Sequence, residues 1–274
     1  MVSRRQGGRL LTRPDPSGAQ GMIETEMTLS QRYDEVRGRI ADAAVRAGRT
    51  SDEIFLVAVT KYTEMDQIRE LVELGHRDFG ENRVPQLVQR AAMIEEFIRR
   101  RAALGQDKAI EPARWHMIGH LQRNKARKLG DSARLIHSVD SLRLAEELQL
   151  VGLGYEKPID VLIQVNIAGE ESKSGCPLPA CEPLADAIES MAHLRVRGLM
   201  TMAPYSENPE DSRIHFVRLR ELFEDMAKVG FGDGMFNILS MGMSGDYEVA
   251  IEEGANIVRI GSAIFGKPKV EEPA

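Results

Sequence analysis

The stretch IDVLIQVN, residues 159–166, is a nearly continuous apolar run of the kind found in parallel strands that are buried on both faces. A helical pattern follows over 178–192, and a second such run, LRVRGLMTM, follows at 194–202. A strand, a helix and a strand in this order predict two parallel strands joined by a crossover helix. This unit decides the fold class, because the same rhythm continues in both directions along the chain.

Eight candidate strands alternate with helices and predict an α/β fold, a single (β/α)₈ TIM barrel. The strands are expected at 55–60, 77–81, 114–119, 134–139, 159–166, 194–202, 236–241 and 256–261. The helices are expected at 83–101, 122–129, 141–150, 178–192, 209–229 and 246–253, with one more that Thr63 caps. An open doubly wound sheet is the structural alternative, although no G-x-G-x-x-G motif follows the first strand.

The first helical pattern provides a further element of the ring. It begins at Thr28 or Ser30, with Gln31 placed to complete a capping box. Only eight residues follow Gly266, which are too few for a full eighth outer helix. We therefore expect the helix at 30–47 to complete the outer ring of the barrel.

The chain is expected to contain one domain, a barrel over 28–274. Residues 1–27 differ from it: they contain four arginines, several glycines and prolines, and no amphipathic period. We expect a disordered tail without a function of its own. A transit peptide and a misassigned start codon are the alternatives for this stretch.

The composition limits the class of protein. Apolar residues make up 42% of the chain and charged residues 28%, as in soluble globular proteins, and no apolar run approaches the about 20 residues that span a bilayer. The formal net charge of -6 argues against nonspecific nucleic-acid binding. Cys176 and Cys181 fit neither a disulfide framework nor a common metal pattern. We expect a cytoplasmic protein with no metal, membrane or nucleic-acid partner.

Lys61 follows VAVT, at the expected end of the first strand. The active site of a barrel lies at the carboxyl ends of its strands, so this amine is expected at the site. Desolvation in the barrel favours a free amine, which can attack an aldehyde. A lysine that reaches solvent from a strand end is the alternative. If the strand geometry continues, Tyr62 faces away from Lys61.

The last two strand ends resemble a phosphate site. Strand seven leads from Ser240 to Ser244 and a helix, and strand eight ends in Gly261 and Ser262. Barrels frequently bind phosphate in these loops, where backbone N–H groups and hydroxyls donate to the anion. A turn with an N-cap at Ser244 explains the same residues. Strand alternation points Arg259 to the same side as Gly261, where it could meet a pyridine nitrogen or, alternatively, pair with a core carboxylate.

Several segments together are specific for one family. They are VAVTK at 57–61, FGEN at 79–82, WHMIGHLQRNK at 115–125, HSVDS at 137–141, QVNIAGEESKSG at 164–175, VRGLMTM at 196–202, LSMGMSGDYEVAI at 239–251 and VRIGSAIFG at 258–266. By these motifs the chain resembles the pyridoxal phosphate homeostasis protein family, single-domain relatives of the alanine racemase N-terminal barrel. The motifs run in unbroken order from about residue 30 to 266.

The resemblance implies that the barrel holds pyridoxal 5′-phosphate (PLP) as a Schiff base on Lys61, with Arg259 opposite the pyridine nitrogen. It implies phosphate contacts on the last two strands and an asparagine beside the cofactor. The cofactor-binding residues that it implies are Lys61, Asn82, Ser240, Arg259, Gly261 and Ser262. Many relatives have threonine in place of Ser262, which keeps the hydroxyl.

The resemblance also implies a carrier or regulator of intracellular PLP levels, with no established reaction and no catalytic residue. An arginine stays charged and does not protonate the pyridine nitrogen, which leaves the ring a weaker electron sink. A weak PLP-dependent amino-acid racemase is the first alternative, although no tyrosine is an obvious second base. A cofactor-free aldolase that uses Lys61 is the second. We expect a monomer whose partners are PLP and recipient apo enzymes.

Overall fold

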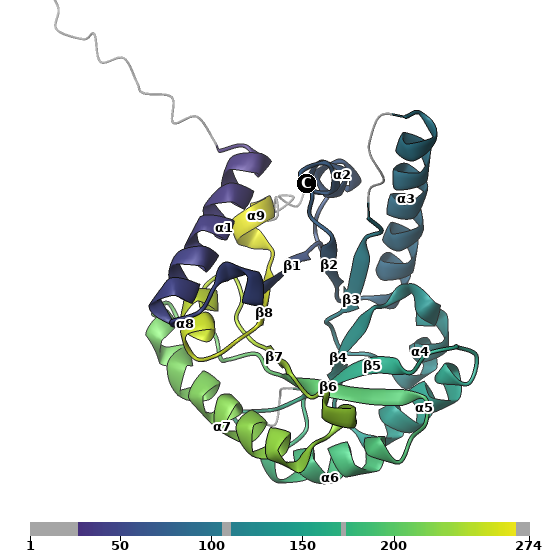
Figure 1. Cartoon of the computed structure of the whole chain (residues 1–274), viewed down its shortest axis with the longest axis vertical. Coiled ribbons are helices and arrows are strands. Elements are labelled where there is room, and N and C mark those ends of the chain that lie inside the picture. Colours follow the sequence, from purple (N-terminus) through teal and green to yellow (C-terminus); the bar gives the residue numbers. More distant parts are fainter. Residues whose placement is uncertain (1–26, 106–110, 171–173, 267–274) are drawn as a thin grey trace, which may run out of the picture.

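The computed structural model describes residues 27–105, 111–170 and 174–266, which form a closed parallel barrel (Figure 1). Each strand pairs with the next one in sequence, and the last pairs with the first. The strands are β1 (Phe55–Val59), β2 (Asp78–Glu81), β3 (Arg114–Met117), β4 (Leu135–Val139), β5 (Ile159–Gln164), β6 (Leu194–Met200), β7 (Ile238–Ser240) and β8 (Ile257–Ile260). The predicted TIM barrel is confirmed, and the open sheet is wrong.

The helices lie outside the strands (Figure 1). They are α1 (Leu29–Arg46), α2 (Met65–Glu73), α3 (Val84–Ala103), α4 (Arg123–Leu129), α5 (Leu142–Gly152), α6 (Leu178–Glu189), α7 (Arg213–Val229), α8 (Tyr247–Glu252) and α9 (Ser262–Phe265). The helix expected at 209–229 begins as a separate 3₁₀ turn, Pro209–Ser212, before α7. Within the described ranges, none of the helices combines the length and apolar character that crossing a bilayer requires.

The first helix completes the ring, as expected. α1 packs against α8 and α9, at the other end of the described chain. The Arg32 guanidinium donates to the Ile264 carbonyl oxygen at 2.7 Å, and Arg46 pairs with Glu252 at 2.7 Å. Apolar residues on one face of α1 are buried against the barrel. Helix α1 therefore occupies the place that the four-residue α9 leaves open.

Two expected helix starts have different outcomes. The capping box at α1 is confirmed: the Gln31 N–H donates to the Thr28 hydroxyl at 3.2 Å, and the Thr28 N–H donates to Gln31 Oε1 at 2.8 Å. The expected cap at Thr63 is wrong, because α2 begins at Met65 and Glu64 is its N-cap. Thr63 is buried instead in the turn that follows β1.

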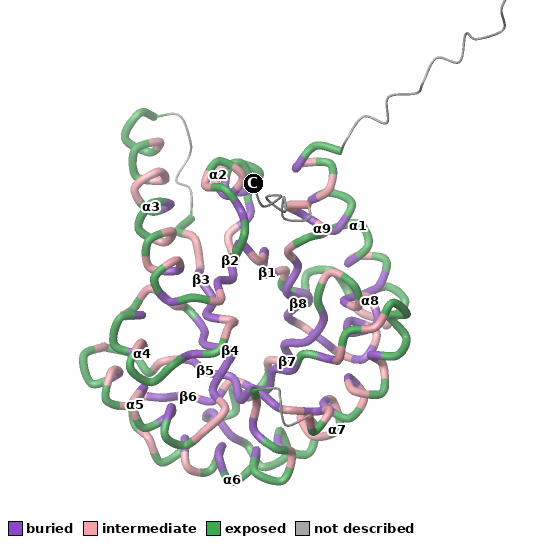
Figure 2. Tube along the Cα trace, turned by 180° about the vertical axis from the view of Figure 1, so that it is seen from behind, coloured by how far each residue is buried: buried purple, intermediate pink, exposed green. Residues whose placement is uncertain are grey.

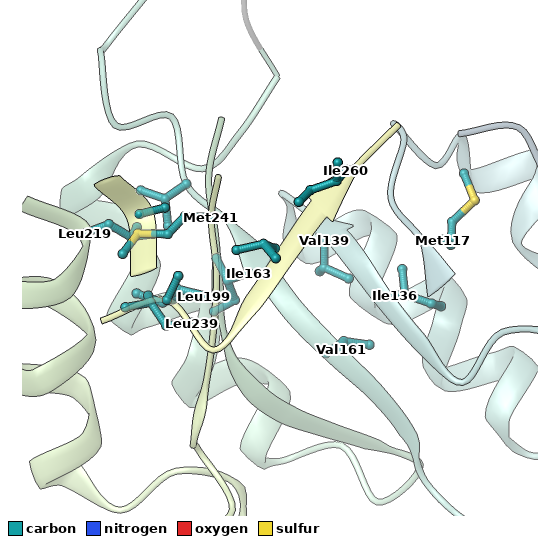
Figure 3. Packing of buried hydrophobic residues seen from close by; sticks show 14 of the residues in the cluster. Met117, Ile136, Val139, Val161, Ile163, Leu199, Leu219, Leu239, Met241 and Ile260 are labelled. Carbon is teal, nitrogen blue, oxygen red and sulfur yellow. The ribbon is translucent and has the colours of Figure 1, made fainter. Parts of the chain in front are cut away.

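The apolar core has two parts. The larger part lies between the strands and the outer helices, where Leu219 of α7 packs near Leu199 and Leu239 (Figure 3). The smaller part fills the barrel interior and consists of Val57, Leu135, Leu162, Met200 and Ile257. Burial follows the strands, and exposed residues lie on the outer helices (Figure 2). Since side chains alternate along a strand, the residues of the smaller part identify which positions face the interior.

Part of the predicted domain organisation concerns residues that the structure does not describe. The expectation of a functionless tail over 1–27 lies outside the described residues, apart from Met27. The boundaries of the expected domain, 28–274, stay a prediction. The ring of strands and helices itself begins at α1 and extends to α9.

Candidate functional site

Three predicted site residues lie at the carboxyl-terminal edge of neighbouring strands. Val59 of β1 pairs with Gly80 of β2, and Lys61 and Asn82 each follow two residues later. β8 borders β1 on its other side, where a Cβ on Gly261 would lie 3.1 Å from the Val59 carbonyl oxygen. The edge of the barrel therefore brings Lys61, Asn82 and Gly261 together at one opening, which we call the mouth.

Lys61 lies in a turn directly after β1, and its side chain is exposed. Its Nζ lies 5.2 Å from the centroid of the Tyr62 ring, a cation–π contact. The expectation that Tyr62 faces away is wrong, because the strand ends at Val59 and its alternation stops there. The expectation of a desolvated amine is also wrong, since solvent reaches Lys61. The lysine is thus available to a molecule that enters the mouth.

The backbone of Asn82 crosses the end of β3 at very short range. A Cβ on Gly119 would lie 2.4 Å from the Asn82 carbonyl oxygen and 2.6 Å from its Cα. No side chain at position 119 fits unless Asn82 moves. The glycine of the sequence WHMIGH therefore allows Asn82, which is half-buried, to stay at the mouth.

Arg259 lies inside the barrel, as strand alternation predicted. It follows Ile257 of the interior cluster by two residues and is 4% exposed. Its Nη1 donates to the Ser240 hydroxyl at 2.6 Å, and its Nη2 donates to the Thr201 carbonyl oxygen at 2.8 Å. Burial lowers the pKa of Arg259 to about 10. Both partners are neutral, so the alternative of a core arginine paired with a carboxylate is wrong.

A chain of hydrogen bonds continues from Ser240 across the barrel. The Ser240 hydroxyl lies 3.0 Å from His137 Nδ1, and His137 Nε2 lies 3.0 Å from His116 Nδ1. His116 Nε2 lies 3.2 Å from Asp78 Oδ1, and Arg114 donates to both oxygens of Asp78. These side chains, which we call the polar relay, connect β8 with the start of β2.

The charged groups at the two ends of the polar relay determine which atoms donate and which accept along it. Burial alone would raise the pKa of Asp78, but hydrogen bonds from Arg114 and His116 outweigh it and hold that pKa well below its usual range. Burial, followed by the charges of His116 and Arg259, lowers the pKa of His137 well below its usual value. The Asp78 carboxylate can only accept. For neutral imidazoles, each Nε2 then carries the proton, and Ser240 donates to His137.

We expect Ser240→Ala to lower the free energy of unfolding by about 1 to 3 kcal/mol, because Arg259 and His137 then lose a buried partner. Urea unfolding of the protein without PLP measures this difference. Ser262→Ala removes a hydroxyl from an exposed position and is the matched control, with a change within about 0.5 kcal/mol. Equal stability of Ser240→Ala and the wild type would show that this hydroxyl does not join the two groups.

The predicted phosphate residues divide between two levels of the barrel. Ser240 pairs with Ile257 and is fully buried, so it lies below the mouth. At the mouth, Ser244 Oγ accepts from the N–H groups of Gly261 at 3.2 Å and Ala263 at 3.4 Å. The exposed Ser262 lies between them in sequence. The N–H groups of Gly261 and Ala263 thus lie beside Ser244, not beside Ser240.

The alternative role of Ser244 as a helix cap is wrong. α8 begins at Tyr247, and its N-cap is Asp246, which makes no side-chain cap bond. The Asp246 carboxylate instead accepts from the Met243 N–H at 2.6 Å, within the same loop. The Ser244 hydroxyl instead accepts from the N–H groups at the start of α9, which keeps it at the mouth.

Sequence reasoning did not select Asp78, His116 and His137. A signal was present: each is a polar residue at an interior-facing position of a buried strand, and such residues need buried partners. The contact between β4 and β7 cannot be predicted from the sequence, because it forms only when the barrel closes. His137 and Ser240 are 103 positions apart.

The mouth offers three kinds of chemistry. An exposed primary amine can condense with an aldehyde. Backbone N–H groups and hydroxyls beside Gly261 can bind an anion. The buried guanidinium of Arg259 can donate to a neutral ring nitrogen. Within the described residues, no group of three or more His, Cys, Asp or Glu side chains is placed to hold a metal ion.

Comparisons with known proteins show the family of the chain. The family model of the alanine racemase N-terminal domain matches residues 41–268. A pyridoxal phosphate homeostasis protein of Aquifex aeolicus is 40% identical over 247 residues, which cover 89% of this chain and 100% of the relative. The one of Escherichia coli K12 is 39% identical over 237 residues, or 85% and 93%. The chain belongs to the pyridoxal phosphate homeostasis protein family.

Solved structures include close matches to the barrel. The crystal structure of a protein from Bifidobacterium adolescentis is 36% identical with a TM-score of 0.77, and the match covers 86% of this chain and 94% of that one. PipY of Synechococcus elongatus, solved with PLP bound, is 27% identical with a TM-score of 0.70, covering 87% and 100%. Alanine racemase of Corynebacterium glutamicum, at 17% identity and a TM-score of 0.58, shares the fold.

Proposed function

We propose that this protein binds PLP at the mouth, holds it as a Schiff base on Lys61, and acts in the cell as a carrier or regulator of the cofactor. The names of its relatives and the PLP-bound structure of PipY support the choice of ligand. The observation that carries the proposal is the exposed amine of Lys61 at the edge of a barrel whose interior contains the buried Arg259.

The residues of the mouth fit the parts of this ligand. PLP supplies an aldehyde, a ring nitrogen and an anionic phosphate. Lys61 binds at the aldehyde, and Arg259 donates to the ring nitrogen. Ser262 binds the phosphate through its N–H and hydroxyl, and Gly261 lets the anion approach the backbone; Ser244, which accepts from the Gly261 N–H, lies beside them, and Asn82 lies beside the ring. We assign Ser240 an indirect role: it orients Arg259 through the bond at 2.6 Å.

A carrier is favoured over a racemase by the position of Tyr62. A two-base racemase needs a second acid-base group on the face of the substrate opposite the lysine. The Tyr62 ring contacts the Lys61 ammonium itself, so it lies on the side of the first base. The recipients that we propose are apo enzymes that use the same cofactor, in the cytoplasm.

Reduction of the complex tests the proposal. Purified protein is mixed with PLP, its visible spectrum is recorded, and borohydride is added before peptide mapping. We expect a yellow protein and one pyridoxyl group on Lys61. A modified peptide that lacks Lys61, or no modified peptide, would overturn the proposal. A colourless protein that condenses with a carbonyl substrate without PLP would point to the aldolase instead.

A further inference from the structure

The turn that carries Lys61 is anchored at both of its ends. The Thr63 N–H donates to the Thr60 carbonyl oxygen at 2.9 Å, which closes the turn around Lys61 and Tyr62. The Thr60 N–H donates to the Gly80 carbonyl oxygen at 3.0 Å, so the turn is also hydrogen-bonded to β2. The lysine side chain is exposed, but the backbone beneath it is not free.

One guanidinium on α3 bonds to both ends of this turn. Arg90 Nη1 donates to the Thr60 carbonyl oxygen, and Nη2 donates to the Thr63 carbonyl oxygen at 2.6 Å. Nη1 also donates to Glu81 Oε1 at 2.5 Å. A planar guanidinium has donors at fixed angles and can make these contacts together, whereas an ammonium is a single point of charge.

A buried carboxylate orients this guanidinium. The Glu81 side chain is 0% exposed, and that of Arg90 is 16% exposed. Glu81 Oε1 also accepts from the Thr60 hydroxyl at 2.5 Å. Its other oxygen, Oε2, is buried and has no hydrogen-bond partner among the described residues. A buried ion pair with an unpaired oxygen contributes little to the free energy of unfolding. Two apolar side chains in its place often give equal or greater stability.

The pair lies on the outer side of the barrel wall, behind Lys61. Ala58 and Phe79 belong to the core between the strands and the helices, and Thr60 and Glu81 follow each of them by two residues. Alternation therefore places these two side chains on the outer face. Val57 and Gly80, by the same rule, face the interior. Glu81 and Arg90 can thus reach Lys61 only through the backbone.

We propose that Arg90 and Glu81 are positioning residues for Lys61: they fix the Thr60–Thr63 turn so that the amine meets the aldehyde of PLP in a productive orientation. This inference rests on the proposed function of Lys61. A displacement of reacting groups by about 1 Å can cost about a hundredfold in rate. If the turn is anchored at one end instead of two, we expect the position of the lysine amine to vary by about this distance.

Arg90→Lys tests the inference. A lysine keeps the positive charge beside Glu81 but cannot donate to both ends of the turn together. We expect PLP to condense with Lys61 about tenfold more slowly than in the wild type. At saturating PLP the limiting rate should fall while the half-saturating PLP concentration stays unchanged, a split that a purely structural role would not cause. Visible absorbance follows the rate, and borohydride mapping identifies the residue. Rates are compared under conditions in which urea unfolding shows both proteins without PLP to be fully folded, because the variant loses hydrogen bonds to the turn.

Two further variants make the result decisive. Arg100→Lys is the matched control, since Arg100 is exposed on the same helix and pairs with Glu96 at 2.6 Å; it should leave the limiting rate and the half-saturating PLP concentration unchanged. Glu81→Gln keeps an acceptor for Thr60 but removes the charge that orients Arg90, and it should slow condensation in the same direction.

The outcomes separate this inference from the proposed function. If the wild type traps no pyridoxyl group on Lys61, the proposed function fails. If the wild type traps it and both Arg90→Lys and Glu81→Gln match its limiting rate, only the positioning role fails. If both variants lose the folded barrel, Glu81 and Arg90 act in stability alone, and the positioning role is overturned.

Discussion

A Lys61→Ala protein is expected to stay colourless when it is mixed with PLP and to carry no pyridoxyl group after borohydride reduction. The substitution removes the primary amine, without which no Schiff base can form at this position. The barrel should remain folded, because Lys61 is exposed and its contact is the ring of Tyr62, itself exposed. We expect the free energy of unfolding to change by less than about 0.5 kcal/mol.

The control for this loss is another lysine. Lys128 is exposed on α4, away from the turn after β1, and Lys128→Ala should be yellow and trap one pyridoxyl group. Mass spectrometry of the reduced proteins compares the two variants directly. If Lys61→Ala trapped one pyridoxyl group per chain, the amine that holds PLP would have to be a different one.

Acid is expected to destabilise the barrel strongly between pH 6.5 and pH 4. Burial lowers the pKa of His76 to about 4 and lowers the pKa of His137 well below its usual value. Both imidazoles are neutral in the fold and become protonated on unfolding in this window. The unfolded chain thus binds more protons, and stability falls as the pH falls. His76 alone accounts for about 3 kcal/mol, at 1.36 kcal/mol per pH unit.

The contacts of His76 explain why it stays neutral. Its Nδ1 lies 3.2 Å from the Tyr33 hydroxyl, and its Nε2 lies 2.7 Å from the Asp78 carbonyl oxygen. One nitrogen accepts and the other donates, which uses the neutral ring completely. Asp78 adds a second loss at lower pH: its depressed pKa stabilises the fold above its ordinary range near pH 4, and this contribution disappears below it.

Urea unfolding at a series of pH values measures this effect. His76→Gln removes one titrating group and should flatten the decline between pH 6.5 and pH 4 by about 3 kcal/mol, whatever its stability at pH 7. A His76→Gln curve parallel to that of the wild type would show that His76 is not the group that titrates.

The fold was predictable because most of the strands are short apolar runs with a turn signal behind them. Even β2 and β3, which are short and polar, were found at the expected places, since the helices on either side leave room for little else. The errors lie where a strand ends. The sequence YTEM after Lys61 contains a threonine that resembles a cap, but Thr63 closes a turn instead, and this reverses the expected position of Tyr62.

The sequence indicated candidate residues at the edge of the barrel and, in its interior, Arg259 and Ser240, but none behind its wall. Lys61, Asn82 and Gly261 follow strands directly, so the rule for barrel active sites identifies them. Arg90 lies on an outer helix, and helical periodicity marks it only as one of many polar residues. Its contacts with the Lys61 turn depend on how α3 packs on the barrel, which no local pattern encodes.

The seam between α1 and the last elements of the ring has a consequence for biosynthesis. The contact from Arg32 to Ile264 spans 232 positions, and the one from Arg46 to Glu252 spans 206. During translation the part of α1 that packs on α8 and α9 therefore has no cover until more than 200 further residues have been made. Contacts this distant in sequence form slowly, and an uncovered amphipathic helix is a natural substrate for a chaperone during that interval.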